Sequence, residues 1–235
     1  IMKLPENEAD CENLSIAFAT AKGNIRRNSL MDFVNVQSNG KIAMKLDEGD
    51  KLINVALCDD SNDIMLAAKS GKCIRFAVED LRVFVGRNST GVRGIKLQGD
   101  DEVISMSILK HCTASVEERD EYLRVSSAMK RMEAESGGDA CISPDQTGLL
   151  NLLDMAKFEE MRKAEEFILT VTVTGYGKRT SSYEYRVTGR GGQGIANMEM
   201  SPRNKEVVSS FPIEDGKEIM MVTDGGKLIR MPVDD

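Results

Sequence analysis

The chain has 235 residues, of which 41% are hydrophobic and 29% charged, and its formal net charge at pH 7 is −7. This length allows one large domain or two small ones, and either can bury a core. No apolar run approaches the ~20 residues that span a bilayer, and no signal peptide is visible, so the sequence predicts a cytoplasmic protein without a membrane partner.

The cysteine and histidine content argues against disulfides and metal sites. The five cysteines are odd in number and contain no Cys-x-x-Cys pair, which predicts free thiols packed as small hydrophobes. His111 is the only histidine and cannot build a His-rich metal site. The cysteines are Cys11, Cys58, Cys73, Cys112 and Cys141.

Taken in chain order, the sequence repeats one unit four times, with the last copy incomplete. The units cover residues 14–57, 63–109, 167–213 and 218–235. Each begins with a predicted hairpin of two apolar strands around a glycine turn. The predicted turn glycines are Gly23, Gly71, Gly177 and Gly226.

The spacing of these glycines predicts the fold class. Gly23 and Gly71 lie 48 residues apart, Gly177 and Gly226 lie 49 apart, and the step between the two pairs is 106. Periods near 50 built from short strands are typical of propeller-like blades. Residues 64–68 and 219–222 are apolar at both odd and even positions, which is typical of strands in sheets that are covered on both faces. We therefore predict an all-β array, interrupted once by an insertion.

The insertion, residues 111–166, is predicted to form a helical hairpin. Its first helix covers residues 117–135, and its second starts near Ser143 and Pro144 and continues past Phe158. It holds seven Lys/Arg and thirteen Asp/Glu, a net charge of −6, so the rest of the chain is close to neutral. The hairpin either lies against the array or offers a docking surface for another protein.

Two other motifs have modest interpretations. An acid followed by a hydrophobe recurs about nine residues past each turn, at Asp32, Asp80 and, slightly early, Glu184. We interpret these acids as turn or strand-end residues. Residues 189–194 match G-x-G-x-x-G, but β-like residues follow where a dinucleotide site needs a helix. The loop is instead suited to bring its backbone close to an anion.

Positive charge recurs at equivalent places in the units. Lysine stands one residue past three of the turn glycines and arginine four past three of them, while Asn24 and Ser181 are the exceptions. Stacked units would place these charges along one rim, so we predict a DNA-binding surface. Its residues are Arg26, Arg27, Lys72, Arg75, Arg82, Arg87, Arg93, Lys96, Lys178, Arg179, Arg186, Arg190, Lys227 and Arg230.

A rim of this kind matches a duplex better than a single strand. Duplex phosphates follow one another every ~1.7 Å along the axis, and their attraction is independent of sequence. Single strands need aromatic platforms, and this chain has no Trp, seven Phe and four Tyr.

Several strings resemble the C-terminal DNA-wrapping domain of the bacterial DNA gyrase A protein. They are residues 40–46, 89–97, 175–180 and 219–226, and the resemblance covers residues 1–110 and 167–235. It implies a β-pinwheel, a disc of propeller-like blades with exchanged strands, whose basic rim wraps double-stranded DNA. Because the chain begins and stops within the pattern, we expect a fragment that lacks the first and last blades.

The resemblance also implies the wider assembly. In the family, wrapping supports negative supercoiling by a type IIA topoisomerase in which two A and two B subunits hydrolyse ATP with Mg²⁺, near the bacterial nucleoid. We expect no catalytic residue and no cofactor in this chain. The family's active-site tyrosine follows an arginine, and no Arg-Tyr pair occurs here.

Two departures leave alternatives open. The family's heptapeptide Gln-Arg-Arg-Gly-Gly-Lys-Gly is absent and only echoed by residues 190–194, and the helical insertion is uncommon in the family. The absence of the heptapeptide means either that an upstream blade is missing or that the chain resembles the decatenating subunit of topoisomerase IV. A propeller acting as a protein-docking module is the alternative of another class, and an enzyme using a central channel is the weakest, since no convergent acid/base set is visible.

Overall fold

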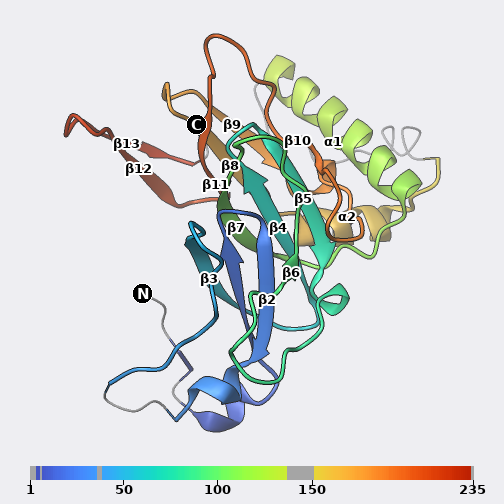
Figure 1. The fold of residues 1–235 in the computed structure, drawn as a ribbon. Coiled ribbons are helices and arrows are strands. Elements are labelled where there is room, and N and C mark those ends of the chain that lie inside the picture. The colour runs from blue at the N-terminus through green and yellow to red at the C-terminus, as the bar shows by residue number, and fades with distance from the viewer. Residues whose placement is uncertain (1–3, 6, 36–38, 137–150, 234–235) are drawn as a thin grey trace.

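The computed structural model describes residues 4–5, 7–35, 39–136 and 151–233. Its strands form four antiparallel sheets, and both helices lie on one side of them (Figure 1). We number the sheets as units 1 to 4 in chain order. Within the described residues, no helix is long and apolar enough to cross a membrane.

Unit 1 is built on the hairpin of β1 (Ser15–Thr20) and β2 (Asn24–Ser29). Its sheet order is β3-β1-β2-β6, with β3 (Leu52–Cys58) on one edge and the short β6 (Val92–Arg93) on the other. β6 follows the hairpin of unit 2 along the chain. Unit 1 is therefore completed by a strand borrowed from the next unit.

Unit 2 repeats this arrangement with the hairpin of β4 (Asn62–Ala68) and β5 (Lys72–Ala77). β7 (Val103–Lys110) pairs with β4, and β10 (Ile195–Ala196), from unit 3, pairs with β5. This second exchange of an outer strand confirms the predicted β-pinwheel. β10 also confirms that a strand, and not a helix, follows the glycine-rich residues 189–194.

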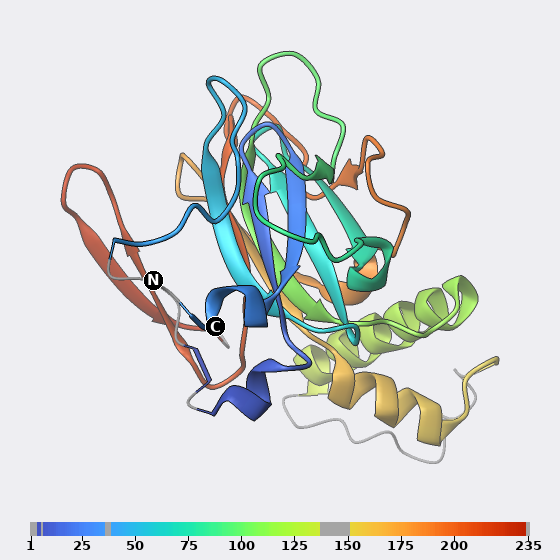
Figure 2. The ribbon, with the colours of Figure 1, turned by 60° about the horizontal axis from the view of Figure 1, so that its bottom comes forward.

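Units 3 and 4 have fewer strands among the described residues. Unit 3 has the order β11-β8-β9, from β8 (Phe167–Thr172), β9 (Gly177–Ser181) and β11 (Val207–Ile213). Unit 4 is the hairpin of β12 (Glu218–Val222) and β13 (Leu228–Pro232), which projects from the other sheets in both views (Figures 1 and 2).

The expectation that residues 219–222 lie in a sheet covered on both faces is wrong for this structure. Met220 and Val222 are 61% and 62% exposed, because among the described residues no further sheet packs on that side of β12. The same expectation is confirmed for β4, where Ile64, Met65 and Leu66 are all buried. Neighbouring sheets cover both faces of β4, which explains its continuous apolar run.

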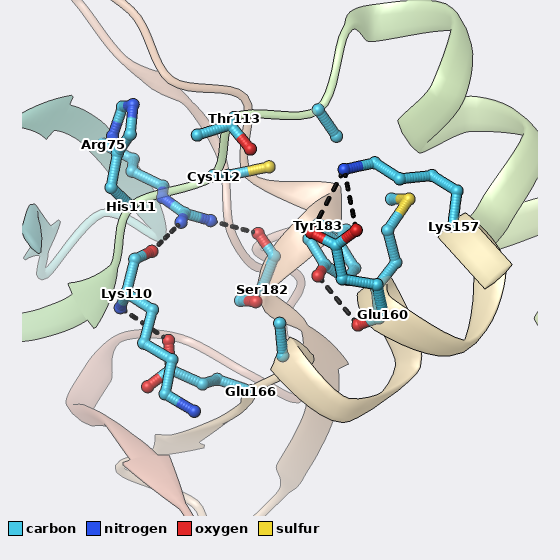
Figure 3. A pocket seen from close by; sticks show the side chains of 13 residues that line it. Arg75, Lys110, His111, Cys112, Thr113, Lys157, Glu160, Glu166, Ser182 and Tyr183 are labelled. Carbon is cyan, nitrogen blue, oxygen red and sulfur yellow. Dashed lines mark hydrogen bonds and ion pairs between the residues drawn. The ribbon is translucent and has the colours of Figure 1, made fainter. Parts of the chain in front are cut away.

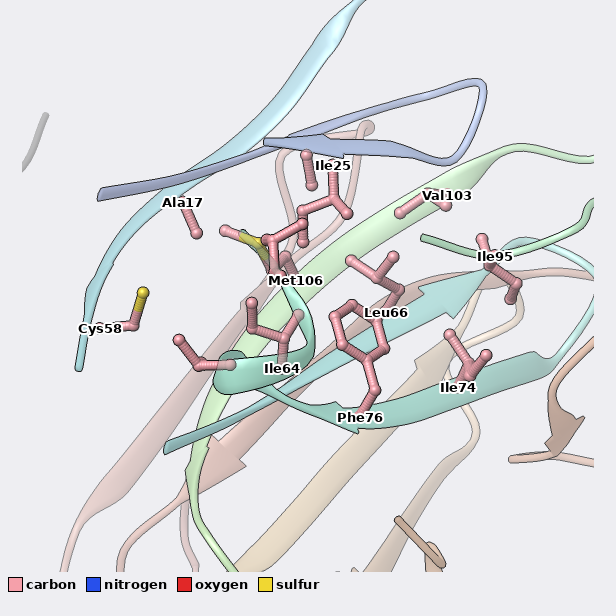
Figure 4. Close-up of a cluster of buried hydrophobic side chains, with 13 residues drawn as sticks. Ala17, Ile25, Cys58, Ile64, Leu66, Ile74, Phe76, Ile95, Val103 and Met106 are labelled. Atoms are coloured by element: carbon pink, nitrogen blue, oxygen red, sulfur yellow. The ribbon is translucent and has the colours of Figure 1, made fainter. Parts of the chain in front are cut away.

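The main core lies between units 1 and 2. Ile25 of β2, Leu66 and Phe76 of the unit 2 hairpin, and Ile95 belong to one cluster of buried side chains (Figure 4). On the other edge, β7 packs against both β3 and β11. The last strands of successive units thus gather together, whereas β6 and β10 lie on the opposite edges of their sheets, which we call the rim.

Two glycines permit the strand exchange. Gly91 precedes β6 with φ +88°, and a Cβ there would lie 2.3 Å from the carbonyl oxygen of Ile25. Gly194 precedes β10 with φ +73°, and a Cβ there would lie 2.3 Å from the carbonyl oxygen of Cys73. Only glycine allows the borrowed strand this approach to the hairpin.

Short 3₁₀ turns follow the hairpins and hold the three recurring acids. This confirms their interpretation as turn residues. The turns are η2 (Leu30–Phe33) with Asp32, η3 (Val78–Asp80) with Asp80, and η5 (Ser182–Glu184) with Glu184, while η1 (Glu8–Cys11) precedes unit 1.

Where it is described, the insertion forms two helices, which pack against unit 3. α1 (Val116–Ser136) matches the predicted first helix within one residue at each end. α2 (Met155–Ala164) starts later than predicted, because the carboxylate of Asp154 accepts from the Lys157 amide and caps it, and residues 151–154 are not helical. The predicted start at residues 143–144 lies outside the described residues. The residue boundaries that the sequence predicts for the four units and for the insertion remain predictions.

The described cysteines are free thiols, as expected. Cys11, Cys58 and Cys73 are buried and Cys112 is half-buried, whereas residue 141 lies outside the described residues. Burial raises the pKa of Cys58 to about 11 and that of Cys73 to about 12. These thiols act as core hydrophobes.

Candidate functional site

The turn glycine of unit 3 is Gly175, and the prediction of Gly177 is wrong. The four turn glycines have φ of +81°, +82°, +83° and +76°, and each donates its N–H to the carbonyl three residues earlier. Gly177 instead belongs to β9. The turn glycines are Gly23, Gly71, Gly175 and Gly226.

This correction changes which cations are equivalent. The residue four past the turn glycine is arginine in all four units, with Arg179 in place of the supposed exception Ser181. The residue one past the glycine in unit 3 is Tyr176, so Lys178 is not equivalent to Lys72 or Lys227. With Gly175 as the reference, the acid Glu184 is also nine residues past its turn, as in units 1 and 2.

The arginine of unit 1, Arg27, joins unit 1 to unit 2. Its Nε donates to Ser15 Oγ over 2.9 Å, and its Nη1 donates to the Val78 carbonyl at η3 over 3.1 Å. Its Nη2 pairs with Asp60, in the connection between the two units. The side chain is buried, so every direction of the guanidinium fork is taken by the protein.

Arg75 makes an equivalent, though not identical, set of contacts between units 2 and 3. Its Nε donates to Asp63 over 2.8 Å, its Nη1 to the Ser182 carbonyl at η5 over 2.7 Å, and its Nη2 to the Lys110 carbonyl over 2.8 Å. Figure 3 shows the last two bonds. The Nε partner lies twelve residues before the arginine here and in unit 1. We call this arrangement the arginine clamp.

The same position is more exposed in units 3 and 4. Arg179 lies over the ring of Phe167, 4.1 Å from its centroid, and pairs with Asp215. Arg230 pairs with Glu218. Phe167 and Glu218 again lie twelve residues before their arginines. The recurring arginine therefore always contacts the start of its own hairpin, a pattern that sequence reasoning missed although polar Ser15, Asp63 and Glu218 carried its signal.

Arg26 is also occupied inside the protein. It is fully buried, and its guanidinium donates to Asn28 Oδ1 over 2.8 Å, to the Ser89 carbonyl over 2.8 Å and to the Gly86 carbonyl. Burial lowers the pKa of Arg26, and the carboxylate of Asp32 opposes that shift. Arg26, Arg27 and Arg75 are not accessible to a ligand in this structure.

The other predicted cations are accessible, and several are brought together at the rim. We call two segments the rim loops: residues 82–96, which include β6, and residues 186–194, which lead into β10. Their exposed or half-buried cations are Arg82, Arg87, Arg93, Lys96, Arg186 and Arg190.

The two rim loops contact each other directly. The Gly191 amide donates to the Gly94 carbonyl over 2.6 Å, and the Lys96 amide donates to the Gly192 carbonyl over 2.8 Å. Arg190 Nη1 donates to the Arg93 carbonyl over 3.3 Å. Arg93, Lys96 and Arg190 therefore form one basic surface that crosses the boundary between two units.

The other predicted cations have surroundings of their own. Lys72 is half-buried beside β10, and Lys178 is exposed on β9, 3.9 Å from Glu184. Lys227 and Arg230 lie on the projecting hairpin of unit 4. Arg82 stacks on Phe84, 4.4 Å from its centroid, which holds it against the rim loop.

The described residues include no group of three or more His, Cys, Asp and Glu side chains that could hold a metal ion. Tyr122, Tyr183 and Tyr185 are buried, and burial raises the pKa of each well above its usual value. Their hydroxyls are hydrogen-bonded within the protein, for example Tyr185 to Asn197 Oδ1 over 2.7 Å. The exposed charged groups of the rim loops that the prediction named are the arginine and lysine side chains, which are suited to contact phosphates.

Comparison with known proteins identifies the family to which the chain belongs. The family model described as DNA gyrase C-terminal domain, beta-propeller, matches residues 15–59, 62–110, 166–214 and 217–235. The DNA gyrase A protein of Granulibacter bethesdensis is 53% identical over 243 residues, which cover 100% of this chain and 26% of that protein. The chain thus spans about a quarter of the length of this relative.

Solved structures show the same fold at lower identity. The C-terminal domain of DNA topoisomerase IV matches with a TM-score of 0.66 at 16% identity, covering 95% of this chain and 53% of that one. The DNA gyrase A C-terminal domain matches with a TM-score of 0.65 at 19% identity, covering 95% and 57%. The fold alone does not separate the two proteins, and the 53% sequence identity favours gyrase.

Proposed function

Because the chain belongs to the family of DNA gyrase C-terminal domains, we propose that it binds double-stranded DNA along the rim loops and bends it around the array. The observation that carries this proposal is the junction of the rim loops, where Arg93, Lys96 and Arg190 share one outward surface. Phosphates of a duplex crossing from one unit to the next would meet these cations in succession.

The proposed interface is smaller than the one predicted from sequence. It omits Arg26, Arg27 and Arg75, which are buried, and it rests on the rim-loop cations together with Lys72, Lys178 and Arg179. The accessible cations at the rim of unit 4, Lys227 and Arg230, extend it if the duplex continues onto the projecting hairpin.

For the whole protein, we propose the role that its relatives' name implies. The bent duplex would support supercoiling by a gyrase in the bacterial cytoplasm, with two A and two B subunits. The catalytic groups of that enzyme would lie outside this part of the chain. Decatenation, as in topoisomerase IV, is the alternative that the shared fold leaves.

The direct test is duplex binding by this chain as a function of salt. Each phosphate-bound cation contributes ~0.9 to the negative slope of log affinity against log salt. We expect a steep negative slope that is the same for unrelated DNA sequences. A flat salt dependence would overturn the proposal, as would equally tight binding of a neutral polymer in place of the duplex.

A further inference from the structure

The helical insertion lies between unit 2 and unit 3 in the sequence, and its two ends lie close together. It leaves the sheet after β7 at Lys110 and returns to it at Glu166, just before β8. The Lys110 amide donates to Glu166 Oε2 over 2.8 Å, so the two ends of the insertion are held side by side (Figure 3). Both ends of the insertion are therefore attached at the junction of units 2 and 3.

On the unit 3 side, Tyr183 of η5 is part of the insertion's hydrophobic core. Its ring meets that of Tyr122 of α1 edge-on, with centroids 5.1 Å apart, and its hydroxyl donates to the Met161 carbonyl of α2 over 2.9 Å. Tyr122 in turn lies 5.0 Å from the ring of Phe158. The 3₁₀ turn of unit 3 is thereby fixed to both helices.

On the unit 2 side, the insertion reaches the arginine clamp. His111, its first residue, donates from Nδ1 to Asp63 Oδ1 over 2.6 Å, since a carboxylate oxygen accepts. Asp63 is fully buried and receives Arg75 Nε on its other oxygen. Arg75 then holds the carbonyl of Ser182, the residue before Tyr183. These contacts thus form a continuous series that joins unit 2, unit 3 and the insertion.

Hydrogen bonds join the two helices of the insertion to each other. Glu121 of α1 accepts from the backbone amides of Asn151, Leu152 and Leu153, which lead into α2. Tyr122 also donates to Glu165 Oε2 over 2.8 Å at the far end of α2. These bonds tie α1 to the residues at both ends of α2.

The junction between units 1 and 2 provides a comparison without these parts. There Arg27 uses Ser15 and the 67% exposed carboxylate of Asp60, and residues 59–61 alone connect β3 to β4. The two junctions otherwise share the clamp. The insertion therefore adds restraint at one junction of the array and leaves the other with the clamp only.

We propose that the insertion is a brace that fixes the angle between units 2 and 3, with His111 and Tyr183 as its positioning residues. Since the rim loops of these units carry the proposed DNA surface, the brace sets the direction in which the duplex passes from one to the next. This consequence for DNA rests on the proposed function, whereas the brace itself does not.

Hydrogen exchange of two equivalent amides tests the brace without DNA. Thr188 donates to the Arg75 carbonyl between units 2 and 3, and Phe84 donates to the Arg27 carbonyl between units 1 and 2, each over 2.8 Å. In His111→Ala, which removes a bond to a charged group, we expect the Thr188 amide to exchange about tenfold faster and Phe84 to be unchanged. Equal acceleration of both amides, or of neither, would overturn the proposal.

Two further variants, His111→Asn and Tyr183→Phe, distinguish loss of the brace from a general folding defect. His111→Asn keeps an N–H donor near the position of Nδ1, so it should restore slow exchange at Thr188. Tyr183→Phe removes only the bond to the Met161 carbonyl and should accelerate Thr188 but not Phe84. Arg131→Ala, on the exposed side of α1, is the matched control and should change neither amide. Failure of His111→Asn to restore slow exchange would also contradict the proposal.

The consequence for DNA is measured with a duplex shorter than its ~150-base-pair persistence length, labelled with a donor and an acceptor dye at its ends. At saturation, His111→Ala should show lower energy transfer than the unaltered chain, with an unchanged salt slope. A reduced slope would instead make the insertion a DNA contact. If the unaltered chain binds no duplex, the proposed function fails while the exchange result still decides the brace.

Discussion

Arg75 and Asp63 form an ion pair of 2.8 Å whose side chains are 2% and 0% exposed. Removing one partner of such a pair leaves an uncompensated buried charge, which costs about 3–5 kcal/mol. We therefore expect Arg75→Ala to lower the free energy of unfolding by about that amount in urea denaturation. The exposed Arg93→Ala should change it by less than about 0.5 kcal/mol. A stable Arg75→Ala protein that loses only DNA affinity would contradict the clamp.

The strand exchange predicts a contrast between two glycines of the same rim loop. In Gly194→Ala, the new Cβ would lie 2.3 Å from the Cys73 carbonyl at φ +73°, so β10 must leave β5. We expect a loss of about 1–3 kcal/mol and faster exchange of the β5 amides. Gly189→Ala, which meets nothing within 4 Å, is the control. Equal stability of the two variants would show that the borrowed strand is dispensable.

The lowered pKa of Glu121 predicts that the stability of the protein depends on pH through the insertion. Burial would raise the pKa of Glu121, but hydrogen bonds from the amides of Asn151, Leu153 and Leu152 outweigh it and lower the pKa. A carboxyl with a lowered folded pKa stabilises fully above its unfolded pKa of ~4.3 and loses this effect as pH falls through the folded value. Glu121→Gln should thus be less stable than the unaltered chain at pH 7, and the difference should shrink in acid. A difference that grows in acid would contradict this assignment.

The thiols should differ in reactivity according to burial. Burial raises the pKa of Cys58 to about 11 and that of Cys73 to about 12, so little thiolate forms at pH 8. Among the described cysteines, the half-buried Cys112 should be alkylated first, as mass spectrometry of timed iodoacetamide reactions would show. In denaturant, the cysteines should react with iodoacetamide at similar rates. Early labelling of Cys73 in the folded protein would mean that β5 opens readily.

The repeat pattern was sufficient to predict the architecture, because hairpin turns and strand periodicity are local properties. The period near 50 and the apolar runs predicted the β units, and the charge-dense segment predicted α1. The break in the predicted second helix at residues 151–154 was missed because it depends on Asp154 as a cap. The exposure of β12 was missed because coverage of a strand depends on its neighbours in space, which an apolar run does not report.

The candidate site was only partly predictable for a related reason. Gly175 and Gly177 flank Tyr176, and sequence cannot tell which of them adopts a positive φ. That choice shifted the register of unit 3 by two residues and hid the equivalence of Arg179 with Arg27 and Arg75. Repetition of a cation at the unit period is equally consistent with a binding surface and with a repeated structural contact. Burial decides in favour of the latter for Arg27 and Arg75.

The central claim is that the exposed cations of the rim loops bind the duplex, and the salt slope of a variant tests it most directly. Replacing Arg93, Lys96 and Arg186 together by Ala removes three exposed cations that take no side-chain part in the clamp. We expect the slope of log affinity against log salt to become shallower by ~0.9 for each phosphate that these cations no longer neutralise. Arg162→Ala with Lys163→Ala, on the exposed end of α2, should leave it unchanged. An unaltered slope in the rim variant, or an equally shallower slope in the α2 variant, would contradict the account.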